Sequence, residues 1–317
     1  MIKKRTFGLK FTFLAVFFCS ALILSGCITV GEGHNVEMVD DISETQMSSN
    51  IDNEFFSKKL PEITSDEYEQ LGDALLRKGK LHLAFLQYER SLQLNPDNLR
   101  VEYKKGMTLL AGKKNNDAIE QFNRILEKDP EHALAYEGLG RAFFQDKKYG
   151  EAEIKFQKAI ELDPRLWKAH NFLGNIYDYQ QRYEEAVTEY KSALAVKPDE
   201  GSLFNNLGVS YSLAGNHKKA VGAFNAALEL KYTKSKVYNN LGLVLANLGR
   251  YSEALEAFKK GGGEARAYNN LGCIYLSQGK AKEAIYCFKK AIEIDPVFYA
   301  KASENLERAK SNFGDQD

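Results

Sequence analysis

Seven glycines set the period of this chain and so constrain what it can fold into. Six of them are each 34 residues apart, and the seventh follows after 30. An alanine stands twelve residues after every glycine, and an aromatic residue stands four residues after that. The markers are Gly72, Gly106, Gly140, Gly174, Gly208, Gly242 and Gly272; Ala84, Ala118, Ala152, Ala186, Ala220, Ala254 and Ala284; and Tyr88, Phe122, Phe156, Tyr190, Phe224, Phe258 and Phe288. Self-similarity at such a period indicates an array of small units that stack on one another, instead of one enlarged core.

Each marker has a physical role in a pair of packed helices. The glycine and the alanine let two helices approach closely, because neither carries a bulky side chain. We expect the aromatic residue to fill the space between adjacent units, where it buries the most apolar area. Proline cannot continue a helix, so it ends the second helix of a unit. Five of the six prolines stand at such places: Pro96, Pro130, Pro164, Pro198 and Pro296.

This pattern resembles the tetratricopeptide repeat, a helix–turn–helix unit of 34 residues. The resemblance implies an all-α fold, a right-handed superhelical solenoid of about seven units. The units are 65–98, 99–132, 133–166, 167–200, 201–234, 235–264 and 265–298. Residues 299–317 follow as a capping helix and tail. Ala302, Leu306 and Ala309 recur there at helical spacing, and we expect them to cover the apolar face of the last unit.

The sixth unit is irregular. It is four residues shorter than the others, lacks the closing proline and ends in Gly261, Gly262 and Gly263. Four residues are close to one helical turn, and a glycine in a helix costs about 1 kcal/mol. Two interpretations stay open: a hinge between units six and seven, or a shortened loop with no mechanical role.

Residues 1–26 have the organisation of an export signal. Lys3, Lys4 and Arg5 precede an apolar run at 11–24, shorter than the ~20 residues that span a bilayer. The run ends in Leu-Ser-Gly-Cys, with the cysteine at Cys27. This ending resembles the bacterial lipobox, which implies a lipidated Cys27 as the mature N-terminus. Because Ile28 stands where an aspartate marks inner-membrane retention in Gram-negative families, the analogy favours the periplasmic face of the outer membrane.

Residues 27–64 comprise Cys27 and a polar, acidic segment in which no helical or strand period persists. We expect a flexible tether there, with a short helix at 51–60 as a weaker alternative. Without the four basic residues of the first 26, the chain has a formal net charge of −4. A mildly acidic body lacks the basic patch that nucleic acid requires.

No motif in the sequence indicates catalysis. The five histidines are scattered, and no His-Glu-x-x-His, Cys-x-x-Cys or Gly-x-Ser-x-Gly occurs. The glycine cluster 261–263 follows a helix and not a strand, so it does not resemble a phosphate loop. We therefore expect no enzymatic activity, no cofactor, no metal site and no nucleic-acid partner.

Two cysteines, Cys273 and Cys287, lie in the seventh unit. In an oxidising periplasm a disulfide between them would close a loop worth ~3 kcal/mol in chain-entropy models. The alternative, which we favour, is that both are packed thiols, because the two residues lie on different helices.

In the tetratricopeptide family the first helix of each unit lines the concave side of the solenoid. With Ser65 as position 1, positions 2, 5, 9, 12 and 13 of each first helix face this groove. Position 5 carries four successive asparagines, and position 6 carries three beside them. These are Asn171, Asn205, Asn239 and Asn269, then Asn206, Asn240 and Asn270. An amide both donates and accepts, and the row resembles the asparagine ladders with which related proteins hold peptide backbones. The position-6 set has an alternative role, which is to satisfy neighbouring backbone groups.

The groove is expected to change character along its length. The first unit contributes the charged Asp66, Glu69, Asp73 and Arg77, and units five to seven contribute the apolar Val209, Leu213, Leu243 and Leu276. Units three and four contribute Arg141, Phe144, Lys168 and Tyr179. An extended or helical partner segment with apolar side chains would suit the C-terminal half.

These observations predict a membrane-anchored scaffold that binds proteins or peptide segments. The resemblance to pilotins and to the Tad-type pilus assembly lipoprotein favours an envelope assembly factor for a pilus or secretion system. Scaffolds for peptidoglycan hydrolases and the lipoprotein partner of the barrel-assembly machine are alternatives, and the non-catalytic arm of an enzyme complex is a further one. A homodimer stays open.

Overall fold

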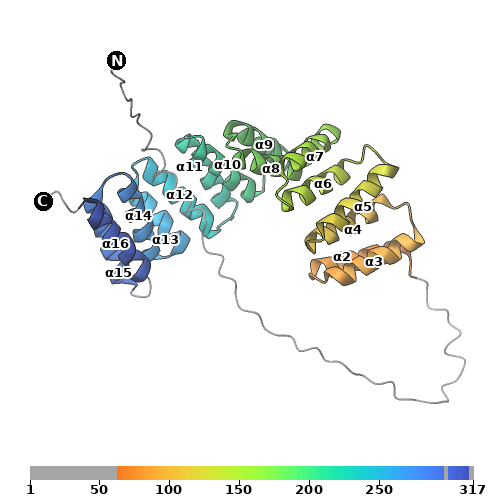
Figure 1. Cartoon of the computed structure of the whole chain (residues 1–317), viewed down its shortest axis with the longest axis horizontal. Coiled ribbons are helices and arrows are strands. Elements are labelled where there is room, and N and C mark those ends of the chain that lie inside the picture. The colour runs from red at the N-terminus through yellow and green to blue at the C-terminus, as the bar shows by residue number, and fades with distance from the viewer. Residues whose placement is uncertain (1–62, 296–298, 314–317) are drawn as a thin grey trace, which may run out of the picture.

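The computed structural model describes residues 63–295 and 299–313, and in these ranges the chain is helical throughout, without a strand (Figure 1). The predicted signal peptide, Cys27, the tether up to residue 62 and the alternative helix at 51–60 lie outside the described residues. The helices are α2 (Ser65–Arg77), α3 (Leu81–Leu94), α4 (Leu99–Ala111), α5 (Asn115–Lys128), α6 (Ala133–Gln145), α7 (Tyr149–Leu162), α8 (Trp167–Tyr179), α9 (Tyr183–Val196), α10 (Gly201–Leu213), α11 (His217–Glu229), α12 (Ser235–Asn247), α13 (Tyr251–Gly262), α14 (Glu264–Ser277), α15 (Ala281–Ile294) and α16 (Tyr299–Phe313). The predicted all-helical solenoid is confirmed.

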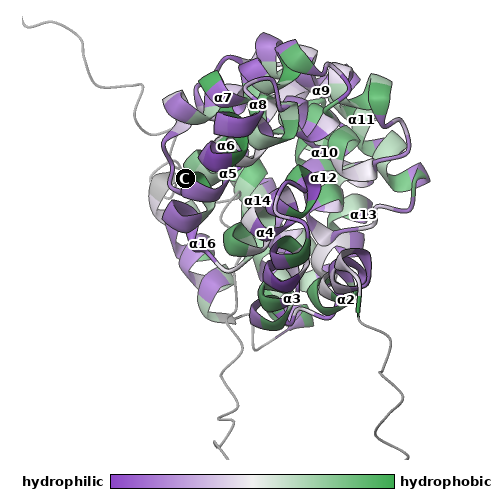
Figure 2. Cartoon of the chain, turned by 90° about the vertical axis from the view of Figure 1, so that its right-hand side faces the viewer, coloured by the Kyte–Doolittle hydropathy of each residue, from purple (hydrophilic) through white to green (hydrophobic). Residues whose placement is uncertain are grey.

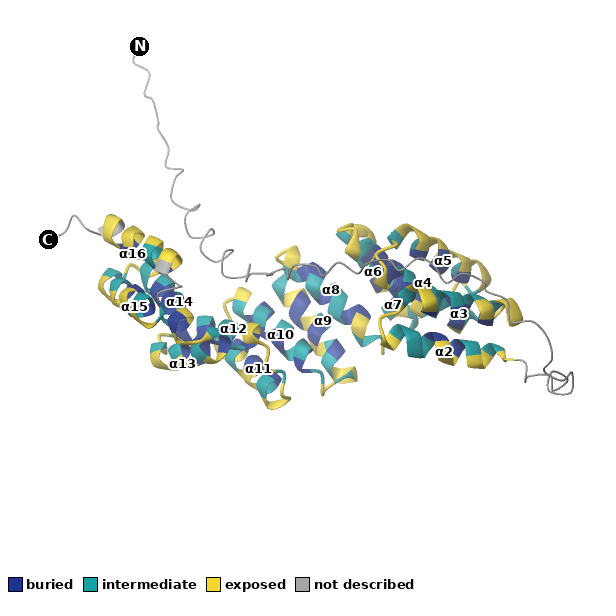
Figure 3. Cartoon of the chain, turned by 90° about the horizontal axis from the view of Figure 1, so that it is seen from below, coloured by how far each residue is buried: buried dark blue, intermediate teal, exposed yellow. Residues whose placement is uncertain are grey.

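The helices stack in chain order, and each packs on the one that follows. First helices of neighbouring units also contact one another, for example α6 with α8 and α8 with α10. Figure 1 shows the stack as an arch, with α6 and α8 on its inner side and α7 and α9 on its outer side. Figure 2 shows apolar residues in every unit, and Figure 3 shows buried residues between helices along the whole stack. The core is therefore elongated and divided into clusters along the stack, with no central globule.

The contact between the marker glycine and the marker aromatic residue holds each unit together. The aromatic rings are 0–1% exposed in all seven units. A Cβ added at Gly208 would lie 2.7 Å from the ring of Phe224, and one at Gly72 would lie 2.5 Å from the ring of Tyr88. The ring therefore rests on the glycine of its own unit. The ring of Phe122 also lies against the next unit, where a Cβ added at Gly138 would be 2.5 Å from it, so the expected packing between units is seen there beside the contact within the unit.

One turn position requires a left-handed backbone. Between the two helices of each unit, the residue fifteen positions into the unit has a positive φ of 58–76°. Glycine supplies it in four units, at Gly79, Gly215, Gly249 and Gly279, whereas Lys113, Lys147 and Gln181 supply it in the other three. A side chain with a Cβ is strained in this conformation, so units two, three and four hold their turns against a local cost.

The shortened sixth unit joins the seventh through a single residue. Helix α13 has 12 residues, and Gly263, with a φ of 84°, connects it directly to α14. Gly261 is buried, and a Cβ there would meet the side-chain oxygen of Asn239 in α12. This glycine thus lets α13 approach α12 closely. Helix α13 is thus one or two residues shorter than the other second helices, and the hinge stays a prediction.

Helix α16 covers the last unit. Ala302, Leu306 and Ala309 are 0%, 9% and 0% exposed, and the last two cluster with Phe288 of α15. The amide of Asn305 donates to Asn269 of α14 at 2.9 Å. The predicted burial of these three side chains is therefore confirmed.

The glycine–aromatic contact predicts opposite effects for two glycine substitutions. Gly208→Ala forces the buried ring of Phe224 to move and should lower the free energy of unfolding by about 1–3 kcal/mol. Gly222→Ala, inside α11 with nothing within 4 Å of its Cβ, should raise it by about 0.5–1 kcal/mol through helix propensity. Urea unfolding followed by circular dichroism measures both. Equal effects would contradict the assigned contact.

Candidate peptide-binding surface along the first helices

The asparagines of α8 and α10 form an amide bridge between two units. Asn206 donates to Asn171 at 3.0 Å, and Asn205 donates to Asn206 at 3.1 Å. Asn171 and Asn206 are partly exposed. The bridge aligns α8 with α10 and leaves amide groups at the surface between them.

Two members of the predicted row differ from the expectation. Asn205 and Asn269 are only 2% and 3% exposed, because the stacked first helices close over position 5 in these units. Asn269 accepts from Asn305 of the capping helix. Asn269 thus joins α14 to α16, whereas Asn205 donates to Asn206 of its own helix. Because both side chains are buried, an open peptide ladder does not include them.

The remaining asparagines lie farther along the stack. Asn239, Asn240 and Asn270 are partly exposed. The side-chain oxygen of Asn239 is itself buried, accepts no hydrogen bond within the described residues and faces Gly261. Asn240 and Asn270 occupy position 6 of their units, as Asn206 does in unit five, and all three are partly exposed.

Aromatic and basic side chains meet where α6 packs on α8. Phe144 lies edge-on to Phe172 at 5.1 Å, and Arg141 lies over the same ring at 5.6 Å. Phe144 also contacts Tyr149, whose ring is 4.5 Å from that of Tyr179. Tyr179 is 70% exposed. The structure therefore joins Arg141, Phe144 and Tyr179 into one surface through two rings that the sequence analysis did not select. We call these five side chains the α6–α8 surface.

A buried carboxylate lies beneath this surface. Glu137 is 2% exposed, and Arg141 is its ion-pair partner at 3.5 Å. Burial raises the pKa of Glu137, while the charges of Arg141 and Lys168 oppose that shift. The exposed Lys168 lies over the ring of Trp167 at 5.6 Å. Two cations therefore stand near one carboxylate, which leaves positive charge available to a partner.

A second buried network links α8, α9 and α10. Ser210 donates to both carboxylate oxygens of Asp178 at 2.8 Å, and the hydroxyl of Tyr190 lies 3.1 Å from Asp178 and 2.8 Å from Asn175. Burial raises the pKa of Asp178 to about 6. The position of Asp178 at groove position 12 was visible in the sequence, but its burial depends on the neighbouring unit.

The first two units neutralise their own charges. Glu69, at position 5 of unit one, is 4% exposed and pairs with Arg100 at 2.6 Å and with Lys104 at 2.7 Å. Lys104 also pairs with Asp73 at 2.6 Å. This end of the groove offers a partner little net charge.

The C-terminal half presents apolar side chains. Leu213 is 44% exposed, and Val209, Leu243 and Leu276 are partly exposed. The structure does not join Cys273 to Cys287, and the thiol of Cys287 is buried. The favoured alternative of packed thiols agrees with this arrangement.

Within residues 63–295 and 299–313, no cluster of three or more histidine, cysteine or acidic side chains is arranged to hold a metal ion. No helix in the same ranges has the length and apolar character needed to cross a bilayer.

Two families match the sequence. The Cilia and flagella-associated protein 70 C-terminal domain matches residues 52–267, and the Tetratricopeptide repeat matches residues 265–298. No curated protein matches it.

Several solved structures are similar to this chain. The MamA protein is 30% identical, with 54% of this chain and 94% of MamA covered and a TM-score of 0.43. Pseudomonas aeruginosa pilF is 21% identical over 68% of this chain and 97% of its own, with a TM-score of 0.52. The APC/C hetero-tetramer Cut9-Hcn1 is 22% identical over 77% and 49%, with a TM-score of 0.54. At these identities the last two show a common fold alone.

The raised pKa of Asp178 predicts a pH-dependent effect of Asp178→Asn. The folded-state pKa of about 6 lies above the unfolded value of about 3.9, so the folded chain binds more protons between them. This contribution to stability is full below about pH 4 and is lost as the pH rises through 6. The variant lacks the ionisation cost. Relative to the unaltered protein, it should therefore gain on the order of 1 kcal/mol between about pH 5 and pH 7.5, after allowance for solvent screening.

Urea unfolding of the unaltered protein and of Asp178→Asn, at about pH 5 and at about pH 7.5, measures how the stability difference between them changes. The other carboxyl groups titrate equally in the two proteins and so cancel. A difference that does not change with pH would contradict the burial of an ionisable Asp178.

Proposed function

Because this chain belongs to the tetratricopeptide-repeat proteins, in the family of the Cilia and flagella-associated protein 70 C-terminal domain, we propose that it is a membrane-anchored scaffold for envelope assembly. Its repeat fold is suited to protein–protein interaction. The scaffold captures a partner segment on the inner side of the arch, along α6, α8 and α10. The assembled structure is a pilus or a secretion system.

The α6–α8 surface is the observation that carries this proposal. It combines the exposed ring of Tyr179 and three partly exposed rings with the guanidinium of Arg141, and Lys168 adds a second cation nearby. Aromatic and arginine side chains dominate the energy of protein interfaces. The adjacent Asn171–Asn206 bridge adds amide donors and acceptors that suit a peptide backbone.

The partner chemistry follows from this composition. An acidic side chain would pair with Arg141 or Lys168, and an apolar side chain would pack on Phe144 and Tyr179. Continuing towards α10 and α12, the partner meets the apolar Leu213 and Leu243. A segment with an acidic end and an apolar remainder therefore binds in one orientation, with its acidic end at the α6–α8 surface and its apolar part towards α12.

The anchoring part of the proposal rests on the N-terminal sequence. Two acyl chains on Cys27 would give stable anchoring, since each buried CH₂ contributes about 0.8 kcal/mol. A flexible tether of the length of 28–64 has an average span of roughly 30–35 Å. Such a tether would hold the groove clear of the lipid headgroups.

Photocrosslinking tests the groove. A photoreactive amino acid at the exposed Tyr179 should capture a partner in intact cells, whereas the same residue at Ile154, 61% exposed on α7, should not. Arg141→Ala combined with Lys168→Ala should reduce capture roughly ten-fold, because about 1.4 kcal/mol of charge-assisted contact is lost.

The captured proteins decide the assembly role. Pilin, secretin or other secretion subunits support the proposal, whereas wall hydrolases would replace it with the hydrolase scaffold. Equal capture from Tyr179 and Ile154 would contradict the groove assignment.

Cys27→Ser tests the anchor. The variant should incorporate no labelled fatty acid and should leave the membrane fraction, because the acyl chains have no attachment point. Fatty-acid labelling and cell fractionation measure both, with Cys19→Ser as the matched control inside the signal segment. Retention of the label in the Cys27 variant would refute the lipobox interpretation.

A further inference from the structure

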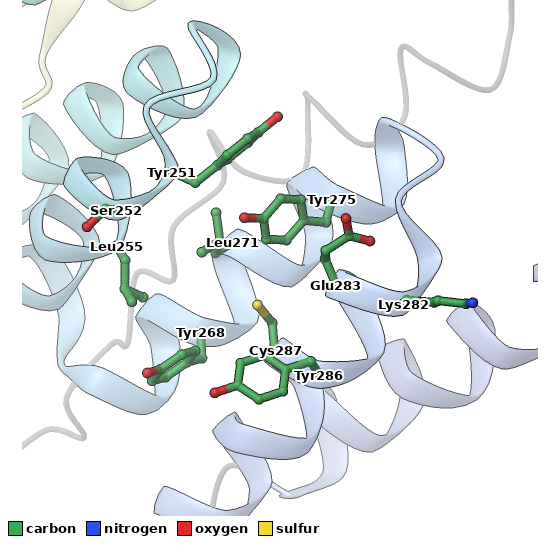
Figure 4. A pocket seen from close by; sticks show the side chains of 10 residues that line it. All are labelled: Tyr251, Ser252, Leu255, Tyr268, Leu271, Tyr275, Lys282, Glu283, Tyr286 and Cys287. Atoms are coloured by element: carbon green, nitrogen blue, oxygen red, sulfur yellow. The ribbon is translucent and has the colours of Figure 1, made fainter.

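A pocket lies at the junction of units six and seven, where the second helices α13 and α15 flank the first helix α14 (Figure 4). Its volume is about 440 Å³, within the usual range for ligand pockets. The pocket is lined by Tyr251, Ser252, Leu255, Tyr268, Leu271, Tyr275, Lys282, Glu283, Tyr286 and Cys287.

Four tyrosines distinguish this pocket from the equivalent places in other units. They are Tyr251, Tyr268, Tyr275 and Tyr286. At the junction of units five and six, the corresponding residues are His217, Tyr238, Leu245 and Glu256. The junction of units four and five has Tyr183, Phe204, Tyr211 and Gly222. The complete set of rings is therefore a feature of the last junction and not of the repeat.

The floor of the pocket is apolar. Leu271 is 5% exposed and Cys287 is 3% exposed. Burial and the nearby charge of Glu283 raise the pKa of the Cys287 thiol to about 11, so it is neutral and packs like a small apolar group. In Figure 4 its sulfur lies among the surrounding rings.

The charges around the pocket select against a cation. Lys280 lies 4.5 Å from the ring centroid of Tyr251 and 5.8 Å from that of Tyr275, and it donates to the Tyr251 hydroxyl at 2.6 Å. Lys282 is an exposed lining residue, and its ammonium group points away from the rings in Figure 4. Two lysines and one glutamate, Glu283, therefore surround the rings, which leaves more positive than negative charge beside the pocket. A neutral aromatic ring from a partner can pack edge-to-face on the tyrosines. Acidic side chains beside that ring would offset the positive charge of the lysines.

The chain itself contains such a segment outside the described residues. Residues 52–56 read Asp-Asn-Glu-Phe-Phe, with the acidic Asp52 and Glu54 beside Phe55 and Phe56. We propose that the tyrosine pocket binds this segment of a second copy of the chain. The phenyl rings enter the pocket, and the two acidic side chains face Lys280 and Lys282.

The geometry assigns the contact to a second copy. Ile63 is seven positions after Phe56, a span of at most about 25 Å at ~3.6 Å per residue. Helix α2 and the pocket helices lie at opposite ends of the arch in Figure 1. Each step from one unit to the next adds about one helix-packing distance of ~8–10 Å, roughly 50 Å measured along the curved stack. The segment of one copy therefore reaches the pocket of its neighbour and not its own.

Such a contact joins different surfaces of the two copies. It is head-to-tail, so it builds open chains or rings instead of a symmetric pair. The contact uses none of the residues of the α6–α8 surface.

Co-purification of two differently tagged full-length copies tests the proposal. Two unaltered copies should retrieve each other. Tyr286→Glu places in the pocket the residue of the equivalent position 256, and Tyr286 is 57% exposed, so the fold should persist. Two copies with Tyr286→Glu should lose retrieval by roughly ten-fold or more, as should two copies with Phe55→Ala and Phe56→Ala.

Complementation identifies the occupant. A copy with Tyr286→Glu keeps its segment, and a copy with Phe55→Ala and Phe56→Ala keeps its pocket, so this mixed pair should retrieve each other. The control Ile154→Glu, on the exposed side of α7, should leave retrieval unchanged. The proposal fails if unaltered copies do not associate, if either variant associates with itself as the unaltered protein does, or if the mixed pair stays apart.

Discussion

The contact between one glycine and one aromatic ring in each unit is the interaction on which the rest of this structure depends. It sets how closely the two helices of a unit approach, as Gly208 and Phe224 show. That spacing in turn fixes how each unit presents its first helix to the next. The α6–α8 surface and the tyrosine pocket are both products of this stacking, since each is assembled from helices of neighbouring units.

The repeat period was sufficient to predict the fold, because one recurring contact explains every unit. Burial within the groove was harder to predict, because it depends on the residue that the next unit brings. Asn171 and Asn205 share position 5, but the first is partly exposed and the second is buried. Phe172 shows the same dependence: it stands at position 6, where later units have asparagine, and it connects Arg141 to Phe144.

Charge is distributed unevenly along the groove. The N-terminal units pair their charges internally, as Glu69 does with Lys104, while Arg141 and Lys168 outnumber the single Glu137 beneath them. The positive charge in the middle of the stack would therefore attract an acidic partner segment to that region. Asp178, which is partly buried, lies next to that region, so its raised pKa couples the stability of the α8–α10 contact to acidity.

Each helix packs chiefly on its neighbours in the chain, and the core has no centre. Elasticity follows from this. A small change of angle at every junction adds up to a large change in the curvature of the arch, and no single contact has to break. A partner held in the groove can therefore bend the whole protein at low energetic cost. The single-residue connection at Gly263 is one of these junctions.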